Sequence, residues 1–148
     1  MRVAVVCGAA VVAVGGAAPG VGAVGGPEAP LAYHGSVALA AGKADVRFAP
    51  HRPASGGAPG GKVTVRLRWS VPLADRQALP RGCVRAESRV LLCRVGGPDA
   101  DGVGQRVGLR VRLRDAPSEV ELELDTVHGA PSGRQRVLVL DTGDTYYF

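Results

Sequence analysis

Several short stretches of the chain alternate hydrophobic and polar residues. The clearest runs from Lys62 to Val71, where every second residue is apolar. A period of two predicts a β-strand with one buried face and one face in water. Shorter strands of the same kind are predicted over 36–40, 44–48, 90–95, 105–114, 119–125 and 136–141. No stretch combines a helical period with capping residues, so the predicted class is all-β.

Segments rich in glycine, proline and polar residues separate these strands. They cover 49–61, 96–103, 115–118 and 128–135. Residues 73–80 are predicted to form either one helical turn or an extended connection. With 148 residues the chain is long enough for one domain. About seven short strands with turns between them predict an antiparallel β-sandwich.

Residues 1–32 have the organisation of an export signal. A short basic start, Met1-Arg2, precedes an apolar run from Val3 to Ala18 and a segment rich in glycine, proline and alanine. This order is typical of a secretory signal peptide. We therefore predict a signal peptide over 1–32 and a secreted domain over 33–148, located outside the cell or associated with the cell wall.

The cleavage site has three candidates, Ala23, Ala32 and Ala40, and Ala32 is the intermediate choice. The apolar run is short and interrupted by glycine, whereas spanning a bilayer takes ~20 apolar residues. We therefore expect a mature form that does not span the membrane. The alternative is an uncleaved N-terminal segment, either disordered or embedded in the membrane.

The three cysteines separate into two groups. Removal of the signal peptide would remove Cys7 and leave Cys83 and Cys93, and an even number in an exported chain favours a disulfide. If residues 82–95 form a tight hairpin centred on Ser88, the two cysteines face each other at a distance that a disulfide accepts. A metal site would need a second Cys/His pair nearby, and a redox site would favour Cys-X-X-Cys; neither pattern is present.

Further features surround this hairpin: Leu79-Pro80, Gly82-Cys83, a ten-residue step to Cys93 and an alternating strand that starts at Gly104. This arrangement over residues 36–141 resembles the Ig-like "conserved repeat" domain of bacterial secreted and surface proteins, a domain of unknown function. The resemblance implies an Ig-like sandwich with a Cys83–Cys93 disulfide and a structural or adhesive role. The loop 49–61 departs from the family, which usually has an Asn-Gly-Pro-like turn after its first long strand.

The sequence ends in three aromatic residues, Tyr146, Tyr147 and Phe148. We expect them to pack on the sandwich or to form a small exposed apolar segment. The stretch 140–148 is similar to the ends of small uncharacterised secreted proteins of GC-rich Gram-positive bacteria. That similarity implies no activity.

Arginines occupy the solvent-facing positions of two predicted strands. The chain has a net charge of +5, carried by 16 Arg and 2 Lys against 13 acidic residues. If the two strands were neighbours, their guanidinium groups would form a basic patch suited to phosphate or sulfate groups. The candidate anion-binding residues are Arg66, Arg68, Arg110, Arg112 and Arg114, with Arg106 on the same strand as the last three.

The alternative is that glutamates neutralise the second strand. A turn at 115–118 would place opposite charges across a hairpin, each pair contributing roughly 0.2–1 kcal/mol. The expected pairs are Arg114 with Glu119, Arg112 with Glu121 and Arg110 with Glu123.

No pattern in the sequence favours catalysis or a metal. Asp99-Ala-Asp101 resembles the start of a calcium loop but lacks its later ligands. Asp141-Thr142-Gly143 matches the aspartic-protease triplet, whose chemistry needs two such carboxylates. The three histidines, His34, His51 and His128, lie far apart in sequence. Neither Ser36 nor Ser70 has the sequence context of an activated nucleophile.

These observations predict a secreted structural or interaction module without catalytic activity or cofactor. The alternative function is binding of an anionic cell-envelope polymer through the arginine-rich strand faces. The partner is unknown, with a cell-wall polymer or a surface protein as candidates. Nucleic-acid binding is not expected of an exported chain in which aromatic residues make up 4%.

Overall fold

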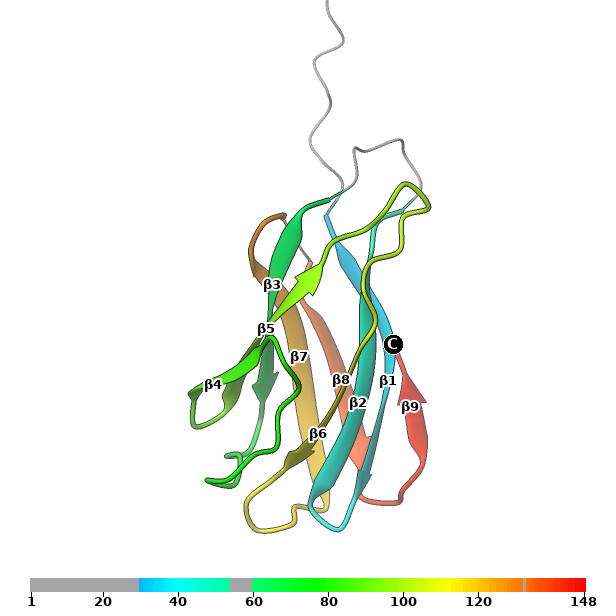
Figure 1. Cartoon of the computed structure of the whole chain (residues 1–148). Coiled ribbons are helices and arrows are strands. Elements are labelled where there is room, and N and C mark those ends of the chain that lie inside the picture. Colours follow the sequence, from blue (N-terminus) through cyan, green and yellow to red (C-terminus); the bar gives the residue numbers. More distant parts are fainter. Residues whose placement is uncertain (1–29, 54–59, 132) are drawn as a thin grey trace, which may run out of the picture.

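The computed structural model describes residues 30–53, 60–131 and 133–148 (Figure 1). This part of the chain contains strands and no helix, and therefore no helix that could cross a membrane. The predicted signal peptide lies outside the described residues up to position 29. The strands are β1 (Ala32–Ala40), β2 (Lys43–His51), β3 (Lys62–Trp69), β4 (Cys83–Glu87), β5 (Val90–Gly96), β6 (Val107–Arg112), β7 (Glu119–His128), β8 (Gln135–Leu140) and β9 (Thr145–Tyr147).

The strands form two antiparallel sheets that share one hydrophobic core. One sheet has the order β6-β2-β1-β9 and the other the order β4-β5-β3-β7-β8. Figure 1 shows them as two layers. The predicted all-β sandwich is confirmed, with nine strands in place of about seven.

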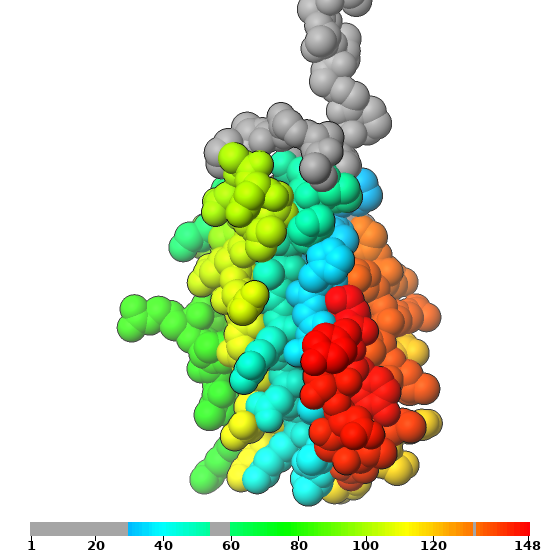
Figure 2. Space-filling view, turned by 90° about the vertical axis from the view of Figure 1, so that its right-hand side faces the viewer, coloured from blue at the N-terminus to red at the C-terminus, as the bar shows by residue number. Residues whose placement is uncertain are grey.

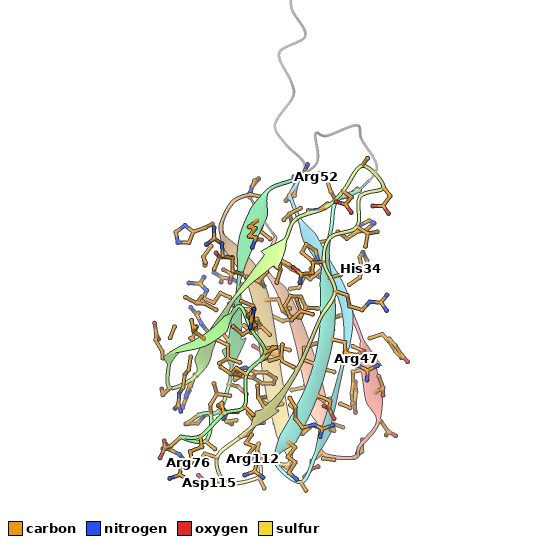
Figure 3. All side chains as sticks on the ribbon, viewed as in Figure 1. His34, Arg47, Arg52, Arg76, Arg112 and Asp115 are labelled. Carbon is orange, nitrogen blue, oxygen red and sulfur yellow. A yellow bond between two sulfur atoms is a disulfide. The ribbon has the colours of Figure 1, made fainter. Side chains whose placement is uncertain are left out.

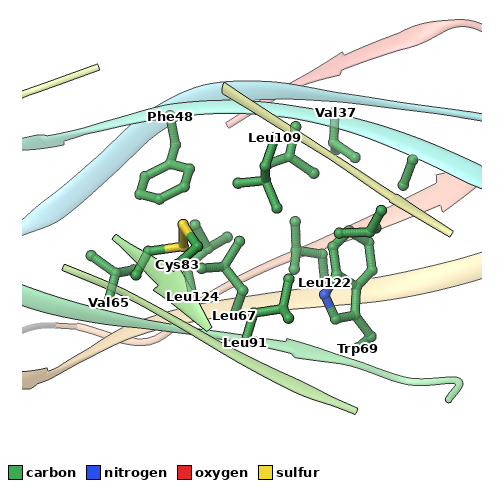
Figure 4. Packing of buried hydrophobic residues seen from close by; sticks show 14 of the residues in the cluster. Val37, Phe48, Val65, Leu67, Trp69, Cys83, Leu91, Leu109, Leu122 and Leu124 are labelled. Carbon is green, nitrogen blue, oxygen red and sulfur yellow. A yellow bond between two sulfur atoms is a disulfide. The ribbon is translucent and has the colours of Figure 1, made fainter. Parts of the chain in front are cut away.

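The alternation in the sequence accounts for the core. On β3, Val63, Val65, Leu67 and Trp69 are buried, as the period of two predicts. On β2 the buried residues include Val46 and Phe48, which approach from the opposite sheet. Figure 4 shows these side chains meeting between the two layers.

The cysteine hairpin is present, and Cys83 pairs with Cys93 in a disulfide. Both cysteines belong to the core, where Figure 4 shows the disulfide beneath Phe48. The turn differs from the predicted one. A register shift between Arg85 and Glu87 moves the connection to Ser88-Arg89, so Ser88 is not its centre.

The first hairpin is longer than the sequence pattern predicted. β1 begins at Ala32 and β2 continues to His51, so the predicted loop 49–61 begins too early. Ala41 and Gly42 connect the two strands with φ angles of 49° and 72°. Positive φ at both central residues is the geometry of a type I′ turn, which matches the twist of the flanking strands.

The predicted pairing of the strand 105–114 with the strand 119–125 is wrong. β6 pairs with β2, whereas β7 pairs with β3 and β8 in the other sheet. The intervening turn, with positive φ at Asp115 and Ala116, carries the chain from one sheet to the other. None of the expected pairs Arg114–Glu119, Arg112–Glu121 and Arg110–Glu123 is therefore formed across a hairpin.

The connection from β3 to β4 is extended and contains no helical turn. Leu73 pairs with Leu113 in an isolated bridge, and its N–H donates to the carbonyl of Ser88 at 2.8 Å. This connection therefore closes one end of the sandwich beside the turn that follows β6.

Candidate anion-binding face

The arginines predicted to bind anions lie on opposite sides of the sandwich. Arg66 and Arg68 belong to β3, and Arg110 and Arg112 belong to β6. Arg114 follows β6 and forms an ion pair with Asp75 at 3.0 Å. Because β3 and β6 are in different sheets, the five side chains do not form one patch.

On the five-stranded sheet, acidic partners neutralise the arginines. The Arg66 Nε donates to Asp125 Oδ1 at 2.9 Å, and a second guanidinium nitrogen donates to the other carboxylate oxygen. This hydrogen-bonded carboxylate raises the pKa of the Arg66 guanidinium. Arg66 is therefore engaged within the sheet.

Glu123 neutralises more of the same face from a buried position. Its carboxylate lies 3.8 Å from Arg68, 3.3 Å from Arg134 and 2.8 Å from Arg136. The prediction that glutamates of β7 neutralise arginines therefore holds, but for different arginines. Their partners are on β3, on β8 and at the residue before β8, and not on β6.

The outer face of the four-stranded sheet retains excess positive charge. Asp45 is the one carboxylate among the strand residues of this face, and it binds Arg110 with an Nε–Oδ1 distance of 2.8 Å. That hydrogen bond raises the pKa of Arg110. Within the described residues, Arg47, Arg106 and Arg112 form no ion pair. The cations of this face are Lys43, Arg47, Arg106, Arg110 and Arg112.

A groove crosses the same face because small residues alternate with large ones across the strands. Ser36 of β1 lies opposite Arg47 of β2 on one side and opposite Tyr147 of β9 on the other. All three side chains point outward, since the residues that alternate with them are buried or half-buried. The short serine leaves a hollow between the arginine and the tyrosine.

The next row of the sheet repeats this pattern. Ala49 of β2 pairs with His34 of β1. Arg106 precedes Val107, which pairs with Phe48, so Arg106 adjoins Ala49 on its other side. Figure 3 shows His34 and Arg47 projecting from the outer surface of this sheet.

The two rows form one groove with a volume of about 520 Å³. Figure 2 shows the strands that carry it side by side, with β9 in red, β1 in blue and β2 in cyan. At one end, the rings of His34 and His51 meet edge to face with centroids 4.7 Å apart. Tyr147 and His34 thus lie on one side of the small residues, and Arg47 and Arg106 on the other.

The aromatic tail both packs on the sandwich and exposes a ring. Tyr146 and Phe148 are half-buried against the core. Tyr147 points the other way, and 81% of its surface is exposed. The tail was expected either to pack on the sandwich or to form an exposed apolar segment. Alternate residues do each: Tyr146 and Phe148 pack on the core, and Tyr147 is exposed.

Two smaller hollows lie elsewhere. One, of about 290 Å³, is lined by Trp69, Arg68, Glu121 and Glu123 among others, and Arg68 there forms an ion pair with Glu123. The other, of about 140 Å³, is lined by Arg81, Arg94 and Arg106. Arg106 lines both this hollow and the groove, so the basic surface continues around the edge of β6.

Two of the carboxylates considered for catalysis or metal binding accept hydrogen bonds from the backbone. Asp101 accepts a hydrogen bond from the Val103 N–H at 3.0 Å, and Asp141 accepts one from the Ala41 N–H at 2.9 Å. Across the described residues there is no group of three or more His, Cys, Asp or Glu that could hold a metal. The groove contains Ser36 and two histidines, but none of its lining residues is a carboxylate that could orient a histidine as in a hydrolase triad.

Several residues of this face were not predicted from the sequence. Arg47, Lys43 and Tyr147 were not among the candidates, and the three histidines were treated as separate. The alternation over 44–48 does place Arg47 on an outward face. Its neighbours follow only from the pairing of β2 with both β1 and β6, which the pattern of one strand does not contain.

No family model, curated protein or solved structure matches this chain. The Ig-like family resemblance therefore stays a prediction.

Proposed function

We propose that this protein is a non-catalytic binding module that holds an anionic polymer on the outer face of its four-stranded sheet. The observation that carries the proposal is the difference between the two faces. The five-stranded sheet pairs its arginines with Glu123 and Asp125, whereas the four-stranded sheet has one carboxylate, Asp45, among the residues of its outer strand faces.

Three of the free cations support the proposal most directly. Arg47, Arg106 and Arg112 form no ion pair within the described residues. Arg47 lies on β2, Arg112 ends β6 and Arg106 precedes β6, all on the outer face of this sheet. A guanidinium group without a carboxylate partner can donate two parallel hydrogen bonds to a phosphate, sulfate or carboxylate. Such a surface attracts a polyanion and retains it more weakly as salt rises.

The extent of the basic surface favours a polymer over a single small anion. The cations run from Arg112, at the end of β6, to Arg106, the residue before β6 begins, and continue to Arg81 and Arg94. Figure 3 places Arg112 near the end opposite to Arg52. A chain with repeated anionic groups would contact several of these side chains at once, and the contributions would add.

Export is part of the proposal, with an envelope polymer as the ligand class. The fold then bears on where the signal peptide would be cleaved, because Leu31 is buried and its N–H donates to the carbonyl of Pro131 at 2.9 Å. A cut after Ala23 would retain this contact, whereas a cut after Ala32 would remove it. The N-terminal sequence of protein secreted by an expressing bacterium tests export; retention of the chain inside the cell would contradict it.

The binding proposal is tested by retention on immobilised polyphosphate across a salt gradient. The purified protein should be retained at low salt and released as salt rises. The variant Arg47→Glu/Arg112→Glu should bind about tenfold more weakly, since each surface charge contact contributes about 0.2–1 kcal/mol and reversal turns attraction into repulsion.

Lys62→Glu/Arg89→Glu is the matched control. Lys62 is exposed at the start of β3 and Arg89 is exposed in the β4–β5 turn, both in the other sheet, and this double substitution changes the net charge by the same amount. We expect it to reduce retention less than twofold. Equal losses for variants of both faces would mean that net charge alone controls retention, and no retention at low salt would refute the proposed function.

A further inference from the structure

We infer that the groove on the four-stranded sheet is a subsite for an anionic sugar unit, with its ring against Tyr147 and its acidic group between Arg47 and Arg106. This inference rests on the proposed function and specifies the polymer as a glycan that carries carboxylate, sulfate or phosphate groups.

The side of the groove formed by Tyr147 is suited to a sugar ring. This ring has no aromatic partner among the described residues, and 81% of the residue is exposed. The face of an aromatic ring carries negative charge density. The axial C–H groups of a pyranose form an apolar, weakly positive face that packs on such a ring, so an exposed tyrosine beside a hollow is a natural platform.

The opposite side is suited to the acidic substituent. Arg47 lies across Ser36 from Tyr147, and Arg106 adjoins Ala49 in the next row. Neighbouring strands lie about 4.8 Å apart, and β1 is the one strand between β9 and β2. The two strand spacings from Tyr147 to Arg47 therefore span about 10 Å, roughly the size of one sugar unit with its substituent. A carboxylate or sulfate on the ring would then accept hydrogen bonds from a guanidinium group that has no other partner.

Polar groups along the groove can bind the hydroxyl groups. The hydroxyl of Ser36 lies between the two sides, and His34 and His51 close one end. An imidazole and a hydroxyl can both donate and accept hydrogen bonds, as sugar hydroxyls require. The volume of about 520 Å³ lies within the range of small-ligand sites.

A sugar fits this groove better than a nucleic-acid base does. Single-stranded nucleic acids bind along several aromatic platforms on which successive bases stack. Here Tyr147 is the one aromatic residue other than histidine whose ring is exposed along the groove, and Phe48 contributes from the buried layer beneath.

The test compares four probes by the same binding measurement: polygalacturonate, polyphosphate, dextran and a single-stranded oligonucleotide. We expect polygalacturonate to bind more tightly than polyphosphate at equal salt, and dextran to bind weakly. Tyr147→Ala should weaken polygalacturonate binding about tenfold, equivalent to ~1.4 kcal/mol. The same variant should change polyphosphate binding less than twofold, because no charge is altered.

Two further variants separate a lost platform from a damaged strand. Tyr147→Phe keeps the ring and should bind polygalacturonate like the wild type. Ser36→Leu fills the centre of the groove without changing a charge. It should weaken the binding of polygalacturonate and leave the binding of polyphosphate unchanged. Leu is compatible with an outward position of a strand, so this variant tests the hollow independently of β9.

The outcomes distinguish this inference from the proposed function. If polygalacturonate binds Tyr147→Ala and Ser36→Leu as tightly as the wild type, the sugar subsite is refuted, while loss of both polymers in Arg47→Glu/Arg112→Glu would still support polyanion binding. If the oligonucleotide binds more tightly than polygalacturonate and its binding depends on Tyr147, the groove binds a nucleic-acid base and the sugar subsite is refuted. If neither polyanion binds, the proposed function itself fails.

Discussion

Gly35 and Phe148 exchange two backbone hydrogen bonds across the edge of the four-stranded sheet. The Gly35 N–H donates to the Phe148 carbonyl at 3.0 Å, and the Phe148 N–H donates to the Gly35 carbonyl at 3.1 Å. This pair extends the β1–β9 ladder by one residue and fixes the strand that presents Tyr147. The exposed side of the groove therefore depends on a glycine of β1.

Substitution of Gly35 is expected to be costly. A Cβ at this position would lie 2.0 Å from the Arg47 carbonyl oxygen and 2.8 Å from the Phe48 Cα, so backbone would have to move. We expect Gly35→Ala to lower the free energy of unfolding by about 1–3 kcal/mol, measured by urea denaturation. Gly61→Ala is the control, since a Cβ there meets nothing within 4 Å. A wild-type midpoint for Gly35→Ala would show that the edge of the sheet adapts easily.

Reduction of the Cys83–Cys93 disulfide is expected to destabilise the domain by about 2–3 kcal/mol. The bond closes a short loop, and most of its effect comes from restricting the unfolded chain. Thermal unfolding with and without reductant measures the change. The Cys83→Ala/Cys93→Ala variant should unfold at a lower temperature and be insensitive to reductant. Equal midpoints for oxidised wild type and this variant would contradict the prediction.

Glu123→Gln is expected to lower the free energy of unfolding by about 1.5–3 kcal/mol, the range for hydrogen bonds to charged groups. Glu123 is 6% exposed, and its carboxylate lies among Arg68, Arg134 and Arg136. The amide would leave these guanidinium groups with a neutral partner. Chemical denaturation provides the measurement, with Glu119→Gln, at an exposed position of the same strand, as the control. Similar small losses for both variants would mean that the buried position adds nothing.

Tyr33 makes the stability sensitive to alkaline pH. Burial raises the pKa of its phenol above 10.0, the hydrogen bond with Thr126 lowers it by less, and the charge of Asp125 raises it further. Because the folded-state pKa is the higher one, this contribution to stability is complete below pH ~10 and is lost as pH rises through the folded-state pKa.

The measurement is urea unfolding at pH 8 and pH 10.5. The wild type should lose more stability between these values than Tyr33→Phe, which has no phenol to ionise. Tyr147→Phe alters an exposed ring and should follow the wild type. A Tyr33→Phe protein with undiminished pH dependence would assign the alkaline effect to other groups.

The period of two in the sequence was sufficient for the fold class. Residues such as Val65, Leu67 and Trp69 are buried where the alternation places them, and the core forms from several such rows. The strand β9 was missed because Thr145-Tyr146-Tyr147 is too short for a period to be recognised. Its position is fixed by pairing with β1 and not by its own composition.

The site depends on information that no single strand contains. The side of each arginine could be predicted from alternation, but its neighbours could not. Arg110 was expected to face Glu123 and instead binds Asp45, because β6 pairs with β2 and the chain then crosses to the other sheet. The positive φ angles of Asp115 and Ala116 are unusual for residues with a side chain, and composition alone does not predict them.

The pairing of β1 with β9 has a consequence for the order in which the domain folds. β1 and β2 form a local hairpin that can close early, but β9 joins them only after the segments that build β3 to β8 have been synthesised. Contacts between segments so distant along the chain form slowly during folding. The groove would therefore be completed late, and a partly synthesised chain would carry Arg47 and Arg106 without Tyr147. Under the proposed function, such a chain would attract an anionic polymer only weakly until β9 has joined the sheet.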